Sequence, residues 1–233
     1  MAASPQTTAD GSQTLYSERF GQTFHSHKGA LSESRHVFLK ASGVEERLTA
    51  GTATRVLEVG FGTGLNFFLS ADAALGAGSS LTYCALEREL LPIEIVQSLT
   101  YGEHLHQPAL VVKYLEFRAQ LPETLAAGSY RFEHGTVKLE ILLGEATEQT
   151  LTHGHYDAVY QDAFSPDANP ELWSTEFLTN LYEALKPGGV LTTYCVKGTV
   201  RRQLQTIGFD VHKLPGPAFG KREMLRATKL ATV

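Results

Sequence analysis

The segment Leu57–Phe68, with the sequence LEVGFGTGLNFF, decides the fold. Its first residues are apolar and predict a short buried strand, and its last residues predict the start of a helix. Gly60, Gly62 and Gly64 lie between these two parts. Glycine permits tight turns and lets backbone N–H groups approach a ligand closely. The segment therefore predicts a strand, a ligand-binding turn and a helix in direct succession.

Strand-like and helix-like runs alternate along the rest of the chain. We expect strands at 55–61, 81–87, 137–145, 156–164, 190–196, 209–215 and 222–228. We expect helices at 65–75, 92–99, 174–185 and 199–208. This alternation predicts an α/β fold, with a largely parallel sheet, helices on both faces and an antiparallel C-terminal strand. Ligands of such sheets bind at the carboxyl ends of the strands.

Two segments precede this main domain, which we place at 51–233. Residues 1–14 are rich in Ser, Thr, Gly and Gln, and we expect a flexible N-terminus. Residues 15–50 are mixed in character and include a predicted helix at 30–39. We interpret 15–50 as a cap or edge hairpin over the main domain.

The composition is typical of a folded protein without a membrane segment. The 233 residues, of which 42% are hydrophobic, suffice for one large α/β domain or two small ones. No apolar run reaches the length of a membrane span, and the N-terminus does not resemble a signal peptide. Cys84 and Cys195 lie in apolar runs without the spacing of metal ligands. These features favour a cytoplasmic protein with reduced thiols and no metal.

The charge is unevenly distributed along the chain. From Lys186 to Val233 there are nine Lys or Arg and two acids, a net charge of +7. The preceding residues hold 11 bases and 23 acids, a net charge of −12. A basic tail on an acidic body fits a surface that binds a polyanion. Bases scattered over a solvated surface explain the same counts equally well.

Glu58 stands two residues before the first glycine of the loop. Dinucleotide-binding folds use the spacing G-x-G-x-x-G to hold a pyrophosphate, whereas this loop reads G-x-G-x-G. An acid at this point would repel a pyrophosphate but could accept hydrogen bonds from a cationic ligand. The pattern resembles the first motif of class I S-adenosylmethionine-dependent methyltransferases, in which the loop packs against the amino-acid part of the cofactor.

Two further acids follow predicted strands. Glu87 ends the strand at 81–87 and could accept hydrogen bonds from both hydroxyls of a ribose. Glu89 is an alternative for this role. The simpler interpretation of either Glu87 or Glu89 is an exposed acid in a polar turn. Glu145 follows the next apolar strand, where methyltransferases accept from the adenine amino group.

Asp162 ends the predicted strand at 156–164. In methyltransferases that act on nitrogen, this position faces the methyl group and the acceptor amine. An alkylamine is mostly protonated at neutral pH, so a carboxylate there can accept the proton and orient the lone pair. A strand-end Asp that caps the following turn is the alternative.

The loop after this strand carries a more specific signature. The sequence DAFSPDANPELW at 162–173 resembles the pattern D-G/A-F-A/S-P-x-x-N-P-x-x-W of a tRNA wobble-uridine methyltransferase family. This family comprises the methyltransferase half of bifunctional MnmC and its stand-alone relatives, MnmD. The segments 16–39 and 186–225 resemble the family's N-terminal segment and C-terminal third, so the similarity covers most of the chain.

The resemblance implies a Rossmann-like domain that uses S-adenosylmethionine. The methionine end of the cofactor would be lined by Glu58, Gly60, Phe61, Gly62, Thr63, Gly64 and Asn66. Glu87 would hold the ribose, and Glu145 and Ala146 the adenine. Asp162 would border the cofactor and deprotonate the acceptor amine.

The implied acceptor is the exocyclic amine of 5-aminomethyl-2-thiouridine in the tRNA anticodon. The base pocket would be formed by Phe24, His25, Ser26, Phe164, Ser165 and Pro166. The tRNA phosphates would contact Arg201, Arg202, Lys221 and Arg222. The chain is too short for the flavin-dependent oxidase domain of MnmC, so we expect no FAD. We also expect no obligate protein partner.

Four other functions are alternatives to the one that the resemblance implies. An aminopropyltransferase of the spermidine synthase type, or an N-methyltransferase of small amines, would share the sheet and the strand-end acid. A non-catalytic RNA-binding module would carry a broken glycine loop, which this chain does not show. A nicotinamide oxidoreductase is disfavoured by Glu58 and by the glycine spacing.

Overall fold

The computed structural model describes residues 5–218, 220 and 222–231. Within these residues, eight strands form one sheet in the order β10-β11-β9-β8-β4-β5-β7-β6. Five neighbouring strands are parallel: β4 (Thr54–Val59), β5 (Leu81–Glu87), β7 (Val137–Leu143), β8 (Tyr156–Gln161) and β9 (Leu185–Thr193). The antiparallel pairings involve β6 (Gly128–His134), β10 (Phe209–Pro215) and β11 (Glu223–Lys229). The predicted α/β class and the antiparallel C-terminal strand are confirmed.

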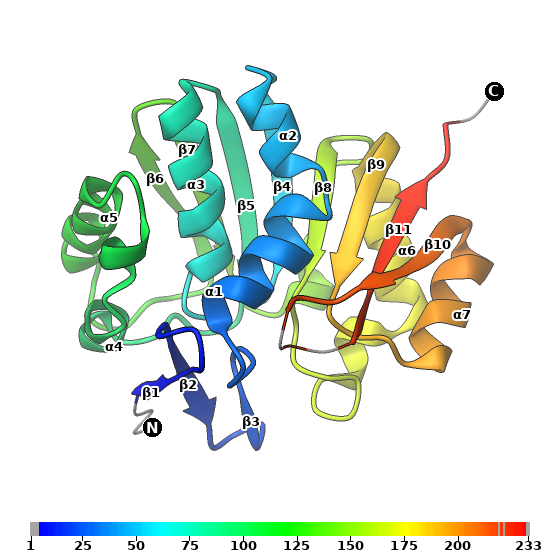
Figure 1. Ribbon diagram of the computed structural model, residues 1–233, viewed down its shortest axis with the longest axis horizontal. Coiled ribbons are helices and arrows are strands. Elements are labelled where there is room, and N and C mark those ends of the chain that lie inside the picture. The colour runs from blue at the N-terminus through cyan, green and yellow to red at the C-terminus, as the bar shows by residue number, and fades with distance from the viewer. Residues whose placement is uncertain (1–4, 219, 221, 232–233) are drawn as a thin grey trace.

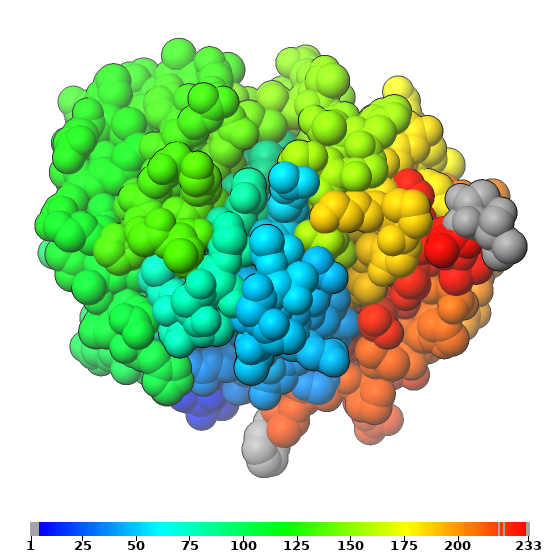
Figure 2. Space-filling view, turned by 90° about the horizontal axis from the view of Figure 1, so that it is seen from above, coloured from blue at the N-terminus to red at the C-terminus, as the bar shows by residue number. Residues whose placement is uncertain are grey.

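Helices cover both faces of the sheet (Figure 1). One face carries α1 (Ala30–Glu33), α2 (Val44–Thr49), α3 (Leu65–Ala77), α4 (Ile93–Ser98) and α5 (Ala109–Ala119). The other face carries α6 (Thr175–Ala184) and α7 (Gly198–Ile207). Short 3-10 turns lie at Tyr101–His104, Ala146–Glu148 and Pro170–Trp173. Across the space-filling view, the colours run from green at the left to red and orange at the right, which follows the strand order from β6 to β10 (Figure 2).

The apolar residues of one strand serve two cores because successive side chains point to opposite faces. In β4, Val56 packs in the core that contains Phe67 of α3. Its neighbour Leu57 packs in the core that contains Leu178 and Leu181 of α6. Each core is fully enclosed, as expected for a mainly parallel sheet.

Sequence-local signals explain where the main helices begin and end. Gly64 and Gly78, with φ of 80° and 65°, precede and follow α3. Ser174 caps α6, because its side chain accepts a hydrogen bond from the backbone N–H of Phe177. Gly208, with φ of 117°, ends α7.

The N-terminal segment forms a small sheet of its own. Three short strands, β1 (Pro5–Thr7), β2 (Gln13–Ser17) and β3 (Gln22–Thr23), form an antiparallel sheet. Flexibility of the segment 1–14 stays a prediction. Residues 1–4 lie outside the described residues, and Pro5–Thr7 and Gln13–Ser17 form strands. The carboxylate of Asp10 anchors the β1–β2 turn, accepting hydrogen bonds from Thr8, Ser12 and Ser32.

Further elements differ from the sequence-based expectation. The predicted helix at 30–39 is α1 followed by a π-helix at Ser34–Lys40. We did not expect α2, α5 and β6. The strand predicted at 190–196 begins earlier, as β9, and its pairing with β8 shifts register between Tyr156 and Ala158. No helix among the described residues is long and apolar enough to cross a membrane.

Candidate active site

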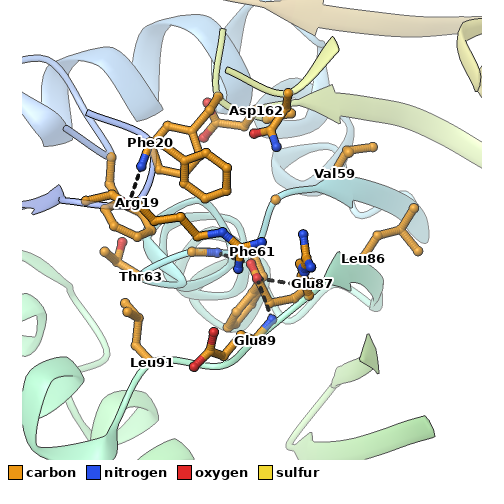
Figure 3. A pocket seen from close by; sticks show the side chains of 18 of the residues that line it. Arg19, Phe20, Val59, Phe61, Thr63, Leu86, Glu87, Glu89, Leu91 and Asp162 are labelled. Carbon is orange, nitrogen blue, oxygen red and sulfur yellow. Dashed lines mark hydrogen bonds between the residues drawn. The ribbon is translucent and has the colours of Figure 1, made fainter. Parts of the chain in front are cut away.

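A cavity of about 220 Å³ opens at the carboxyl ends of the parallel strands. Its floor is the glycine loop after β4, and its sides are the segments that follow β5, β7 and β8. The turn between β2 and β3 contributes Arg19 and Phe20 to the remaining wall (Figure 3). The N-terminal segment thus caps the end of the sheet where ligands of this fold class bind.

The glycine loop has a backbone that other residues would not adopt without strain. Gly60 and Gly62 have φ of 85° and 53°. A Cβ atom on Gly60 would lie 3.1 Å from the carbonyl oxygen of Asp162. A Cβ atom on Gly62 would lie 2.9 Å from the ring of Phe24. Both glycines therefore allow the loop to lie against the cap and the β8 loop while leaving space beside it.

Glu87 is fixed at the end of β5 by backbone donors. Its Oε2 accepts from the N–H of Gly62 at 2.8 Å, and its Oε1 accepts from Arg88 at 2.8 Å and Glu89 at 3.0 Å. Burial raises the pKa of Glu87, while the three N–H donors lower it. The carboxylate is thereby held in one orientation on the cavity wall (Figure 3).

Glu145 follows β7 and lines the cavity together with Ala146. It pairs with Arg88 at 3.0 Å, and both side chains are about half exposed, at 46% and 51%. An ion pair this exposed contributes little stability, so it can open to admit a ligand.

Asp162 directly follows β8 and lines the cavity. Its Oδ2 accepts a hydrogen bond of 2.8 Å from Nδ2 of Asn66, and the same Nδ2 donates to Oε1 of Glu58 at 2.8 Å. Glu58 is fully buried and Asn66 nearly so, and neither lines the cavity. Burial raises the pKa of Glu58 to about 8. We expected Glu58, Gly64 and Asn66 at the cavity surface, but they lie behind it.

An aromatic group stands beside Asp162. The ring of Phe164 stacks on Phe20 with centroids 4.4 Å apart, and Phe24 meets it edge-on at 5.2 Å. Arg19 lies over the Phe20 ring at 5.3 Å. All four side chains line the cavity. The wall next to the acid is thus flat and apolar, which suits a planar ring.

The loop that carries Phe164 is pinned by side-chain hydrogen bonds. Nε1 of Trp173 donates to the carbonyl of Phe164 at 2.8 Å. The Gln22 amide donates to Oγ of Ser165 at 2.7 Å and accepts from its backbone N–H at 3.3 Å. The hydroxyl of Tyr194 donates to the carbonyl of Ala163 at 2.8 Å. Asp162 therefore sits between a rigid strand and a braced loop.

Comparison with known proteins identifies the family. A family model described as S-adenosyl-L-methionine-dependent methyltransferase matches residues 113–230. The chain belongs to this family. The crystal structure of MNMC2 from Aquifex aeolicus matches all of the chain and 72% of that protein, with a TM-score of 0.77 and 28% identity.

Curated relatives of this methyltransferase are longer proteins. The MnmC bifunctional protein of Aromatoleum aromaticum, named for tRNA 5-methylaminomethyl-2-thiouridine biosynthesis, is 37% identical over 94% of the chain. The MnmC of Cupriavidus metallidurans is 34% identical over 95% of the chain. The chain spans about a third of the length of these two proteins, 34% and 33% respectively.

The methyltransferase brings together most of the predicted site. Eleven expected residues line the one cavity: Gly60, Phe61, Gly62, Thr63, Glu87, Glu145, Ala146, Asp162, Phe24, His25 and Phe164. Ser26 and Ser165 directly follow the lining residues His25 and Phe164, and Pro166 is two residues beyond Phe164, but none of the three lines the cavity. His25 is buried, which lowers its pKa to about 4, so it is a neutral wall residue at neutral pH.

The predicted phosphate-binding residues that the structure describes do not line the cavity. Arg201 and Arg202 lie on α7, which Figure 1 shows at the right, away from the cap strands. Arg202 is exposed and borders a shallow hollow between α6 and α7. Arg222 is exposed, and Lys221 lies outside the described residues.

Sequence reasoning missed Arg19, Phe20, Gln22 and Tyr194. Their places at the site depend on contacts between segments that are far apart in the sequence. Gln22 and Ser165, for example, are separated by 143 positions. No local pattern marks such contacts. No cluster of His, Cys, Asp or Glu that could hold a metal occurs in the described part of the chain.

Proposed function

We propose that this methyltransferase transfers a methyl group from S-adenosylmethionine to the exocyclic amine of 5-aminomethyl-2-thiouridine at the tRNA wobble position. The product is 5-methylaminomethyl-2-thiouridine. We further propose that the protein acts in the cytoplasm, together with the tRNA. The observation that carries it is the position of Asp162, between the glycine loop and the Phe164 aromatic wall within one cavity. The MnmC relatives are named for tRNA 5-methylaminomethyl-2-thiouridine biosynthesis, which supports the choice of this nucleoside.

The lining of the cavity fits the cofactor. Gly60 and Gly62 line the cavity, so a bound ligand would lie against the backbone of the glycine loop. Glu87 would accept from the ribose hydroxyls, and Glu145 with Ala146 would border the adenine. The lining is rich in acids, which favours a cationic ligand: Glu18, Glu87, Glu89, Glu145, Asp162 and Glu171. When bound, S-adenosylmethionine supplies a methyl group on a positively charged sulfur.

Asp162 prepares the amine for reaction. An alkylammonium has no free lone pair, so its nitrogen must lose a proton before it can attack. The Asp162 carboxylate can accept that proton and hold the amine nitrogen toward the cofactor side of the cavity. Asp162 lies directly against the glycine loop, because a Cβ atom added to Gly60 would be 3.1 Å from the Asp162 carbonyl oxygen.

The aromatic wall selects the kind of acceptor. Phe164, Phe20 and Phe24 offer a ring face and ring edges beside Asp162. Proteins recognise single-stranded RNA bases by stacking them on such rings, and an anticodon base is already partly unpaired. A linear diamine gains little from this wall, so the observed site favours a nucleobase amine over an aminopropyl acceptor.

The test uses the purified protein, methyl-labelled S-adenosylmethionine and tRNA that carries 5-aminomethyl-2-thiouridine. Mass spectrometry of the digested nucleosides should show labelled 5-methylaminomethyl-2-thiouridine. Asp162→Asn should lower the turnover by about 10²- to 10⁴-fold while cofactor affinity stays within a few-fold. Methyl transfer to putrescine but not to this tRNA would refute the assignment, as would near-normal turnover by Asp162→Asn.

A further inference from the structure

Asn66 joins two acids that come from different strands. It lies in the first turn of α3, and its Nδ2 is 2.8 Å from Oε1 of Glu58 and 2.8 Å from Oδ2 of Asp162. An amide nitrogen carries two hydrogens, so it can donate to both oxygens. The side chain therefore links an acid on the cavity wall to an acid enclosed in the core.

The orientation of the Asn66 amide follows from its neighbours. An ionised carboxylate only accepts hydrogen bonds, so the atom that faces Asp162 must be the nitrogen. The other amide atom, Oδ1, is buried and has no hydrogen-bond partner among the described residues. An unpaired buried acceptor costs stability, and the two bonds to acids offset that cost. The amide is thus held by its nitrogen, through Glu58 and Asp162.

Glu58 supports this arrangement from the core side of Asn66. It shares the α3 side of β4 with Val56, because residues two apart in a strand point to the same face. It is fully buried and does not reach the cavity, so it cannot contact an acceptor there. Its hydrogen-bonded connection to the cavity wall runs through Asn66.

We propose that Asn66 is a positioning residue for methyl transfer. Its Nδ2, which also donates to Glu58, holds Oδ2 of Asp162 in place while the amine is bound. The reason is geometric. A carboxylate on a two-bond side chain can rotate, and a donor on one oxygen fixes the direction in which it meets the amine. This inference rests on the proposed function only for the identity of the amine that is methylated.

The ionisable groups around Asp162 favour a single negative charge at this point. Glu58 on β4, with its pKa raised by burial, is largely neutral at neutral pH. Burial also raises the pKa of Tyr83 on β5 and of Tyr194 after β9, so both are neutral. Glu87 and Glu33 are acids near this group, acting on Glu58 and Tyr194 respectively. Asn66 is a neutral donor that stabilises the ionised form of Asp162 without adding charge.

The experiment compares Asn66→Ala and Asn66→Asp with a matched control, Ser70→Ala. Asn66→Asp keeps the shape but replaces the donor by a third carboxyl group. Ser70 is a buried polar residue on the same helix, bonded to Tyr160 rather than to Asp162. For each protein we would measure turnover, cofactor affinity and the NMR titration of the ¹³C-labelled Asp162 carboxyl group.

Both Asn66 variants should lose about 10- to 100-fold in turnover, with cofactor affinity within about three-fold of the wild type. The titration midpoint of Asp162 should rise by about 1 pH unit in Asn66→Ala, because a donor to the ionised form is gone. Ser70→Ala should change neither quantity. An unmoved midpoint, or a loss of turnover matched by an equal loss of cofactor affinity, would overturn the proposal.

The titration needs no substrate, which separates this inference from the proposed function. A wild-type protein that ignores the tRNA but shows the expected shift of the Asp162 midpoint refutes the substrate and leaves the role of Asn66 standing. A wild-type protein that methylates the tRNA while the Asn66 variants titrate and turn over normally refutes the role of Asn66 alone.

Discussion

Glu58 illustrates how one residue can be correctly noticed and wrongly placed. The motif singles it out as an acid before the glycine loop, which suggests a ligand contact. In the structure its side chain points toward α3, where Asn66 meets it, and not toward the cavity. The spacing of a motif indicates which residues belong to a site. It does not say which side of the strand they occupy relative to the loop that follows.

The burial of Glu58 predicts a pH dependence of stability. Its pKa is about 8 in the folded protein and about 4.5 when exposed. Between these values the folded state binds more protons than the unfolded state, so stability falls as pH rises through this window. Glu58→Gln removes the titrating group and should remove this loss.

Thermal unfolding at pH 5 and pH 8 checks the prediction. From pH 5 to pH 8 the melting temperature of Glu58→Gln should rise relative to that of the wild type by about 10 °C. The exposed Glu94→Gln on α4 is the control and should follow the wild type. His25 acts in the opposite sense: its pKa of about 4 makes stability rise with pH up to about 6.5. Because both proteins contain His25, their difference isolates Glu58.

At the scale of elements, the β2–β3 hairpin and the loop after β8 behave as one unit. Phe20 and Phe24 pack on Phe164, and Gln22 makes two hydrogen bonds with Ser165. The hairpin alone is too short to be stable in water. Its order therefore depends on the loop that it contacts, and the loop depends on the hairpin.

Gln22→Ala should loosen this unit without unfolding the protein. Loss of the two bonds should cost about 1–2 kcal/mol of loop stability. We expect faster backbone hydrogen exchange at residues 163–169 and a change in fluorescence of Trp173, the only tryptophan in the chain. The control is Gln97→Ala, an exposed position on α4. Unchanged exchange in the loop would show that the Gln22 hydrogen bonds do not hold it.

The elements that the sequence predicts well are those with local signals. The helix after the glycine loop starts and ends at glycines, and the strands of the sheet interior are short apolar runs. Two elements missed are hairpin strands whose alternating pattern is weak or short. The two-residue strand β3 pairs with the preceding β2, and the edge strand β6 pairs with the next strand β7 across Gly135 and Thr136. The π-helix at Ser34–Lys40 interrupts a pattern that a regular helix would also satisfy.

At the scale of the whole molecule, the charge pattern and the cavity do not coincide. The basic C-terminal third includes α7 and the β10–β11 hairpin, whereas the cavity is lined with acids. A tRNA that places one base in the cavity would have to reach this basic region with a flanking part of its backbone. The sequence could indicate that basic residues are present but not that they stand apart from the catalytic acid.

Reversing the charge of Arg201 and Arg202 to Glu tests whether α7 contacts RNA. Each lost phosphate contact should lower the slope of log affinity against log salt by about 0.7–0.9, and the affinity should fall at low salt. The control is Arg131→Glu on β6, at the other end of the sheet. Binding of tRNA at several salt concentrations gives both slopes. An unchanged slope would place the RNA surface elsewhere.

The direction of the last strand offers a practical handle. β11 runs antiparallel to β9, so its end lies at the edge of the sheet opposite the cavity. Leu230, the next residue, is 59% exposed. A biotin attached there would anchor the protein to a sensor chip with the cavity facing the flowing buffer. The affinities for nucleosides, cofactor and whole tRNA could then be compared on the same immobilised molecules.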